Sequence, residues 1–123
     1  MKSNMINKFT VRYKFWIENQ EGESLLGDGT WELLNLIRQE GSLMAATQKK
    51  SYSYRKTWNK IKSMEQKLGF ELIDKKRGGA KGGSSELTAY AEKIILLFHL
   101  LHEKMDTFVE QVTQEALKES NFT

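Results

Sequence analysis

Serine and glycine residues divide the middle of the chain into a run of short helices. Ser42 and Ser53 are residue types that favour a helix N-cap, and Gly41 and Gly69 favour the left-handed position just after a helix. Apolar residues lie between these signals at helical spacing. The sequence therefore predicts one helix from near Thr30 to Gly41, a short second helix after Ser42, and a third from Ser53 to just before Gly69.

The second and third helices form a helix-turn-helix pattern over residues 42–68. On the N-terminal side, residues 8–18 alternate between apolar and polar side chains, which is the pattern of a half-buried strand. On the C-terminal side, residues 70–87 hold two strand-like pieces around a turn with four glycines, which predicts a β-hairpin. A long helix is predicted over residues 88–120. One domain over residues 1–123 is the simplest division of a chain of this length.

The final helix has an apolar seam. Its residues recur at alternating spacings of three and four, which is the heptad pattern of helices that pair side by side. A helix of this length is roughly 45 Å long, more than the core of one small domain covers. We therefore expect the first half to pack on the domain and the seam to pair with a second copy of the chain. The seam residues expected to form a homodimer are Ile94, Phe98, Leu101, Met105, Phe108 and Val112.

The net charge of +3 is unevenly distributed along the chain. Residues 49–81 carry eleven Lys and Arg against three acids, a net charge of +8, and the rest of the chain carries −5. The densest part, residues 49–63, has six basic residues and no acid. On a helical wheel Trp58 falls on the apolar side, with Glu65 as the odd member of that side, so we expect Trp58 in the core and the charges on the surface. Tyr54, in the first turn of this helix, could lie either in the core or on the surface.

Three explanations for this basic stretch compete: a solvated helix face, a membrane-surface helix, and a helix that binds nucleic acid. A solvated face would need acidic partners one turn away, and none are near. A membrane helix would need an apolar face that the core already uses. Double-stranded DNA is the best-supported partner, because a helix-turn-helix inserts its second helix into the major groove. Arg55 can then pair with guanine and Asn59 with adenine, while Lys56 and Lys60 suit guanine or phosphate.

Several segments also carry a resemblance to a known family. They are Gly41-Ser42 with Ala45-Ala46, "SYRKTW" at residues 53–58, "RGGAKGG" at residues 77–83, and "LTAYAEKI" at the start of the final helix. In these segments the chain resembles the N-terminal DNA-binding domain of ModE, the molybdate-responsive transcription regulator. It is more loosely similar to the winged-helix domain of LysR-type regulators.

The resemblance implies a mainly α fold with small β content: a winged helix-turn-helix with an N-terminal strand and a long C-terminal dimerisation helix. It implies a transcription regulator that binds an inverted-repeat site as a homodimer. Arg77 and Lys81 would contact DNA from the wing. The recognition-helix contacts that it implies are Ser53, Tyr54, Arg55, Lys56 and Asn59, to which the charge pattern adds Lys60. The family's molybdate-binding region has no counterpart in these 123 residues, so no oxyanion site is implied.

No pattern indicates an enzyme, a cofactor or a metal site. The chain has no cysteine, and its glycine-rich segment lacks the order of a phosphate-binding loop. "SYRK" at residues 53–56 matches S-x-x-K without the partner motifs of that hydrolase class. His99 and His102 lack further ligands at a suitable spacing. The start lacks a signal peptide, and no apolar run could span a bilayer, so we expect a cytoplasmic protein without a membrane partner.

A second hypothesis, of a different class, is a protein-interaction module. Such a module would pair with a full-length regulator through the seam and modulate it, and a stable monomer with an exposed seam would favour it. An RNA-binding module is a weaker third hypothesis, because the deep, narrow major groove of RNA does not admit a helix.

Overall fold

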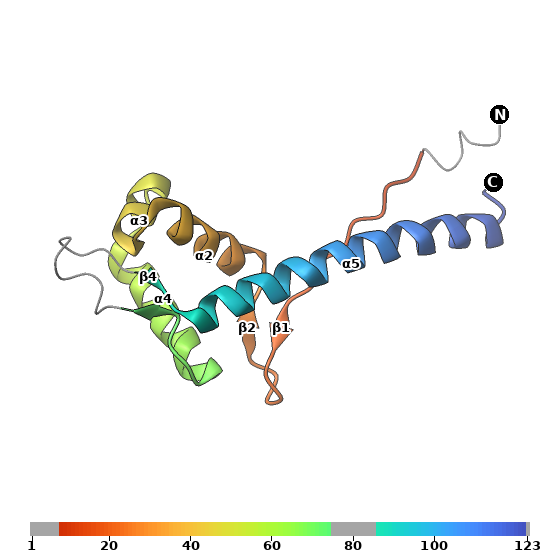
Figure 1. Ribbon diagram of the computed structural model, residues 1–123. Helices are drawn as coiled ribbons and strands as arrows, with labels where there is room; N and C mark the ends of the chain where they lie inside the picture. Colours follow the sequence, from red (N-terminus) through yellow and green to blue (C-terminus); the bar gives the residue numbers. More distant parts are fainter. Residues whose placement is uncertain (1–7, 75–85, 123) are drawn as a thin grey trace. The chain divides into compact units, whose positions relative to one another are not determined.

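The computed structural model describes residues 8–74 and 86–122. In chain order the elements are β1 (Ile17–Glu18), β2 (Ser24–Leu26), α2 (Asp28–Glu40), α3 (Leu43–Lys50), α4 (Tyr54–Leu68), β3 (Ile73–Asp74), β4 (Glu86–Leu87) and α5 (Ala89–Glu119) (Figure 1). β1 pairs with β2 and β3 with β4, both antiparallel. This arrangement confirms the predicted class, a mainly α, winged helix-like fold with small β content and a long C-terminal helix.

The chain divides into two compact units. The larger unit is Phe15–Leu97, and the smaller unit is Met1–Lys14 with Phe98–Thr123. Helix α5 contributes its first residues, 89–97, to the larger unit and the rest to the smaller one. The assignment of residues 1–123 to one domain stays a prediction.

Local capping chemistry sets the helix boundaries of the larger unit. The Ser42 hydroxyl accepts a hydrogen bond from the amide of Ala45 at 3.0 Å, which satisfies a free donor at the start of α3. α2 ends at Gly41 and α4 at Gly69, with φ of 90° and 84°, a left-handed conformation that glycine adopts without strain. α2 begins at Asp28, two residues before the predicted Thr30, because the backbone of Gly27 serves as its N-cap.

The core of the larger unit draws on α2, α3, α4, β3 and the start of α5. Its side chains are almost fully buried, and each such burial stabilises the fold by about 1.5–3 kcal/mol for the larger aliphatic residues. They include Leu34, Ile37, Leu43, Ala46, Ile61, Leu72, Ile73, Ala91 and Ile95. The indole N–H of Trp31 adds a hydrogen bond of 3.2 Å to the carbonyl of Ile95, which joins α2 to α5. α3 and α4 thus share one core with α2 and the start of α5.

The strand predicted over residues 8–18 is wrong for most of its length. Only Ile17–Glu18 forms a strand, and residues 9–16 have no regular secondary structure. An alternating pattern becomes a strand only where a neighbour supplies backbone hydrogen bonds. β2, the partner of β1, is three residues long, so the pairing stops early.

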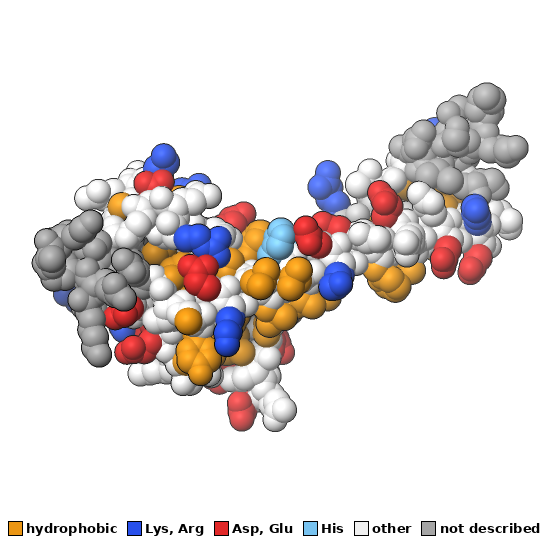
Figure 2. Space-filling view, in the orientation of Figure 1, with side chains coloured by type: hydrophobic (Ala, Val, Ile, Leu, Met, Phe, Trp, Pro, Cys, Tyr) orange, Lys and Arg blue, Asp and Glu red, His pale blue; other side chains and the backbone are white. Residues whose placement is uncertain are grey.

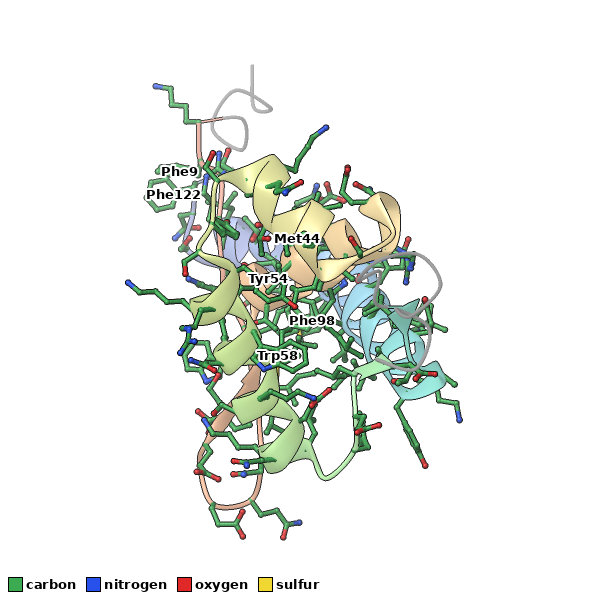
Figure 3. The ribbon with its side chains drawn as sticks, turned by 90° about the vertical axis from the view of Figure 1, so that its left-hand side faces the viewer. Phe9, Met44, Tyr54, Trp58, Phe98 and Phe122 are labelled. Carbon is green, nitrogen blue, oxygen red and sulfur yellow. The ribbon has the colours of Figure 1, made fainter. Side chains whose placement is uncertain are left out.

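In the smaller unit the N-terminal segment lies along α5. The rings of Phe9 and Phe122 meet edge to face with centroids 5.2 Å apart (Figure 3). The Tyr13 hydroxyl donates a hydrogen bond of 2.5 Å to Oδ1 of Asp106. The alternating segment therefore packs on a helix rather than in a sheet.

Burial divides the predicted seam of α5 into two parts. Ile94 and Phe98 are 9% and 0% exposed in the single chain, and the expectation that they contact a second copy stays a prediction. Phe108 and Val112 are 61% and 41% exposed, and hydrophobic side chains are visible along α5 in Figure 2. Only the C-terminal part of the seam offers an apolar surface.

Truncation of a core leucine tests this account. Leu34→Ala should lower the free energy of unfolding by about 2–5 kcal/mol, because the deletion leaves a cavity at a fully buried position. Leu96→Ala makes the same change at a side chain that is 54% exposed and should cost less than about 0.5 kcal/mol. Urea unfolding followed by circular dichroism measures both, and equal losses would contradict the assigned core.

Candidate nucleic-acid interface

A three-residue turn, Ser51–Ser53, joins α3 to α4. Ser51 has φ of 59°, a left-handed conformation that is uncommon for residues other than glycine. Its amide donates to the carbonyl of Gln48 at 3.2 Å, and the amide of Tyr52 donates to the carbonyl of Thr47 at 2.9 Å. These two hydrogen bonds fix the direction in which α4 leaves the turn, and the Ser53 hydroxyl then accepts from the amide of Lys56 at 3.2 Å as N-cap.

Helix α4 has one buried face and one exposed face. Thr57, Ile61, Met64 and Glu65 are buried. The exposed face carries predicted DNA-binding residues, namely Arg55, Lys56, Asn59 and Lys60 with Ser53 at its start. The buried and exposed sets alternate at the helical period, so the core fixes which residues of α4 point outward.

The aromatic residues of α4 lie at the border between its two faces. Trp58 and Tyr54 are half-buried, so the prediction that Trp58 belongs to the core is only partly right. Thr57 and Met64 occupy the core instead, because the helix is turned slightly further than the apolar pattern indicated. Tyr54 and Trp58 stack with centroids 6.4 Å apart and project from the same side of α4 (Figure 3).

The positive charge on this face has no counter-charge in the part of the chain that the structure describes. The first turn of α4 contains no acidic residue. No ion pair joins Arg55, Lys56 or Lys60 to any other residue in the ranges 8–74 and 86–122. Like charges on one helix face repel, and the phosphates of a polyanion would relieve that repulsion.

A groove runs beside the exposed face, between α2 and the start of α4. It is lined by Gly29, Leu33, Ser51, Tyr52, Ser53, Lys56, Thr57 and Lys60. Two ammonium groups and several hydroxyls therefore converge on one concave surface. Such a surface suits the phosphate oxygens of a nucleic-acid backbone.

The strand pair that follows α4 corresponds to the base of the predicted wing. Ile73 pairs with Leu87 and Asp74 with the backbone of Glu86. Arg77 and Lys81, predicted to contact DNA from the wing, lie outside the described residues.

Sequence reasoning left Glu65 unexplained, and the structure gives it a role. Its Oε2 accepts hydrogen bonds from the amides of Leu72 at 2.7 Å and Ile73 at 3.2 Å. Its Oε1 lies 3.0 Å from Nζ of Lys62. Glu65 therefore ties the end of α4 to β3. A charged residue on an otherwise apolar helix face was the only signal in the sequence.

Other chemistry is not assembled in the parts of the chain that the structure describes. His99 pairs with Glu103 at 3.3 Å, and the His102 ring lies edge to face with Phe98. Within those parts no three His, Cys, Asp or Glu side chains gather in a way that would hold a metal ion. None of the helices in the same ranges has the length and apolar character needed to cross a membrane.

These features together define a helix-turn-helix unit of winged helix-like fold with a basic, exposed second helix. The chain is 32% identical over 74 residues to the transcriptional regulator ModE of Haemophilus influenzae, covering 60% of this chain and 29% of that protein. It is 27% identical over 89 residues to the molybdenum transport protein ModE of Azotobacter vinelandii, covering 72% and 33%. It is 33% identical over 69 residues to the DNA-binding transcriptional dual regulator ModE of Escherichia coli (strain K12), covering 56% and 26%.

The similarity supports a relation to ModE transcriptional regulators, as the sequence motifs predicted. The matched region spans between about a quarter and a third of the length of these relatives. No family model matches the chain. The looser likeness to LysR-type regulators stays a prediction.

Removal of the N-cap of α4 tests whether the Ser53 hydroxyl stabilises the start of this helix. Ser53→Ala should lower the free energy of unfolding by about 1 kcal/mol, because the Lys56 amide loses its acceptor. Ser63→Ala, at an exposed position within the same helix, should cause no comparable loss because it removes no cap. Thermal unfolding of both variants measures the difference, and an equally stable Ser53→Ala variant would contradict the capping role.

Proposed function

We propose that this chain is a sequence-specific DNA-binding transcription regulator that acts as a homodimer on an inverted-repeat site. The observation that carries the proposal is the exposed face of α4, where Arg55, Lys56, Asn59 and Lys60 lie together without an acidic partner among the described residues. The relatives named as transcriptional regulators support the same function.

In this mechanism α4 is the recognition helix. Arg55 and Asn59 read base edges in the major groove, as bidentate donors to guanine and adenine respectively. Lys56 and Lys60 bind phosphate or guanine beside them, and Ser53 and Tyr54 lie at the end of the helix that approaches the bases. Arg77 and Lys81 of the wing add contacts to phosphate or the minor groove.

The homodimer would use the exposed part of the seam. Phe108 and Val112 are the most exposed of its residues, and Leu101 and Met105 are half-buried beside them. Pairing of two such helices removes this apolar surface from water. Two recognition helices would then enter successive major grooves, roughly 34 Å apart.

Selection of genomic fragments tests the function directly. The purified chain is incubated with fragments of the source genome at physiological salt, and the retained DNA is sequenced. The double variant Arg55→Ala/Asn59→Ala serves as the control protein. Enrichment of an inverted repeat by the native chain alone would support the proposal, whereas retention without a common sequence, abolished by salt, would mean binding by charge only.

Two substitutions separate base reading from phosphate binding. Asn59→Ala should weaken binding to the selected duplex by about 1–3 kcal/mol and leave binding to a scrambled duplex nearly unchanged. Lys81→Ala should weaken both alike, because a phosphate contact carries no sequence information. Fluorescence-anisotropy titrations on the two duplexes measure this, and equal losses for Asn59→Ala on both would refute its assigned role.

A charge placed on the seam tests the dimer. Phe108→Glu should shift the chain toward the monomer, because a carboxylate would have to be desolvated in the paired surface. Thr107→Glu places the same charge on an exposed neighbour that points away from the seam and should leave the dimer intact. Sedimentation velocity measures the distribution. A native chain that is a stable monomer would instead favour a module that pairs with a full-length regulator.

A further inference from the structure

We propose that Lys62 is a positioning residue for base reading by α4 and, unlike the other lysines of that helix near it, does not bind DNA itself. The inference rests on the proposed function and deepens it. The Lys62 ammonium lies 3.0 Å from Oε1 of Glu65 and 4.5 Å from the centroid of the Trp58 ring. It therefore bridges an almost buried carboxylate and an aromatic face on one side of the helix.

The two ends of this bridge reach different parts of the larger unit. At one end Trp58 stacks on Tyr54 with an angle of 12° between the ring planes. At the other end Glu65, which is 8% exposed, accepts the amides of Leu72 and Ile73. A continuous series of contacts thus runs along α4 from its first turn to the root of β3.

The position of Lys62 distinguishes it from Lys60. The Lys60 side chain is exposed and has no ion pair among the described residues, so it is free to neutralise a phosphate. The Lys62 side chain is 35% exposed, and its ammonium is already engaged by a carboxylate and an aromatic ring. To reach a phosphate it would have to leave both, and Glu65 would then be an almost buried charge without its cationic partner.

Lys62 contacts Trp58, which lies at the border of the exposed face of α4. Tyr54, Arg55, Trp58 and Asn59 together line a shallow hollow on α4. Trp58 and Tyr54 form its aromatic wall, and Arg55 and Asn59 are the residues proposed to read bases. A cation over the Trp58 ring limits the rotamers that Trp58 can adopt. The shape of the hollow in which Arg55 and Asn59 meet the base pairs is thereby fixed.

Substitution of the two lysines by methionine tests the assignment, because methionine keeps most of the apolar stem and removes the charge. Lys62→Met should weaken binding to the selected duplex by about tenfold, leave binding to a scrambled duplex within about twofold, and leave the salt dependence of binding unchanged. Lys60→Met, the matched control, should weaken both duplexes and reduce the slope of log affinity against log salt by about one.

Two further variants keep the test decisive if Lys62→Met folds poorly. Lys62→Arg retains a cation that can contact both the ring and the carboxylate, and should bind the selected duplex within about threefold of the native chain. Trp58→Phe combined with Lys62→Met should cost less than the sum of the two single losses in specific affinity, because both act through one contact. Thermal unfolding without DNA shows which losses come from folding.

The outcomes separate this inference from the proposed function. If Lys62→Met lowers the salt slope by about one and weakens both duplexes, Lys62 is a phosphate contact and the inference fails while DNA binding stands. Native-like specific binding by Lys62→Met, or additive losses in the combined variant, would also overturn it. A native chain that does not distinguish the selected duplex from the scrambled one would refute the proposed function, and this inference with it.

Discussion

The carboxylate of Glu65 is the constraint on which the larger unit depends. It accepts two backbone amides of β3 and its flank, and these amides would otherwise be buried without an acceptor. The carbonyl of Leu72 in turn accepts the amide of Thr88 at 2.9 Å, and the Thr88 hydroxyl caps α5 at the amide of Ala91. One side chain on α4 therefore sets the start of β3, and β3 helps to set the start of α5.

This arrangement explains why the outer face of α4 can carry so much positive charge. The core takes Thr57, Ile61 and Met64 from one side of the helix, and Glu65 is fully engaged with backbone amides and Lys62. No acid on α4 remains to neutralise Arg55 or Lys56. The cost in electrostatic repulsion is small in water and is removed when phosphates approach. Stability and the proposed DNA binding thus use opposite faces of one helix.

The sequence predicted those features that depend on neighbouring residues. Ser42, Ser53, Gly41 and Gly69 act within one helical turn, so the helix boundaries they set could be predicted from the sequence, as could the basic face of α4. The length of the strand within residues 8–18 could not be predicted from neighbouring residues, because a strand needs a partner from elsewhere in the chain. The same holds for the hydrogen bonds of Glu65 to backbone amides, whose donors lie seven and eight residues further on and meet it only where β3 packs against α4.

The apolar seam of α5 shows how one pattern can serve two purposes. An α-helix has 3.6 residues per turn, so a seven-residue repeat drifts around a straight helix by about 20° per heptad. Ile94 and Phe98, in the first heptad, lie on the buried side, whereas Phe108 and Val112, two heptads later, are exposed. The drift over that distance is about 40°, which turns the seam away from its first direction. The same spacing that buries the start of α5 in the chain's own core therefore leaves apolar side chains near its end exposed to water, which is where the proposed homodimer would form.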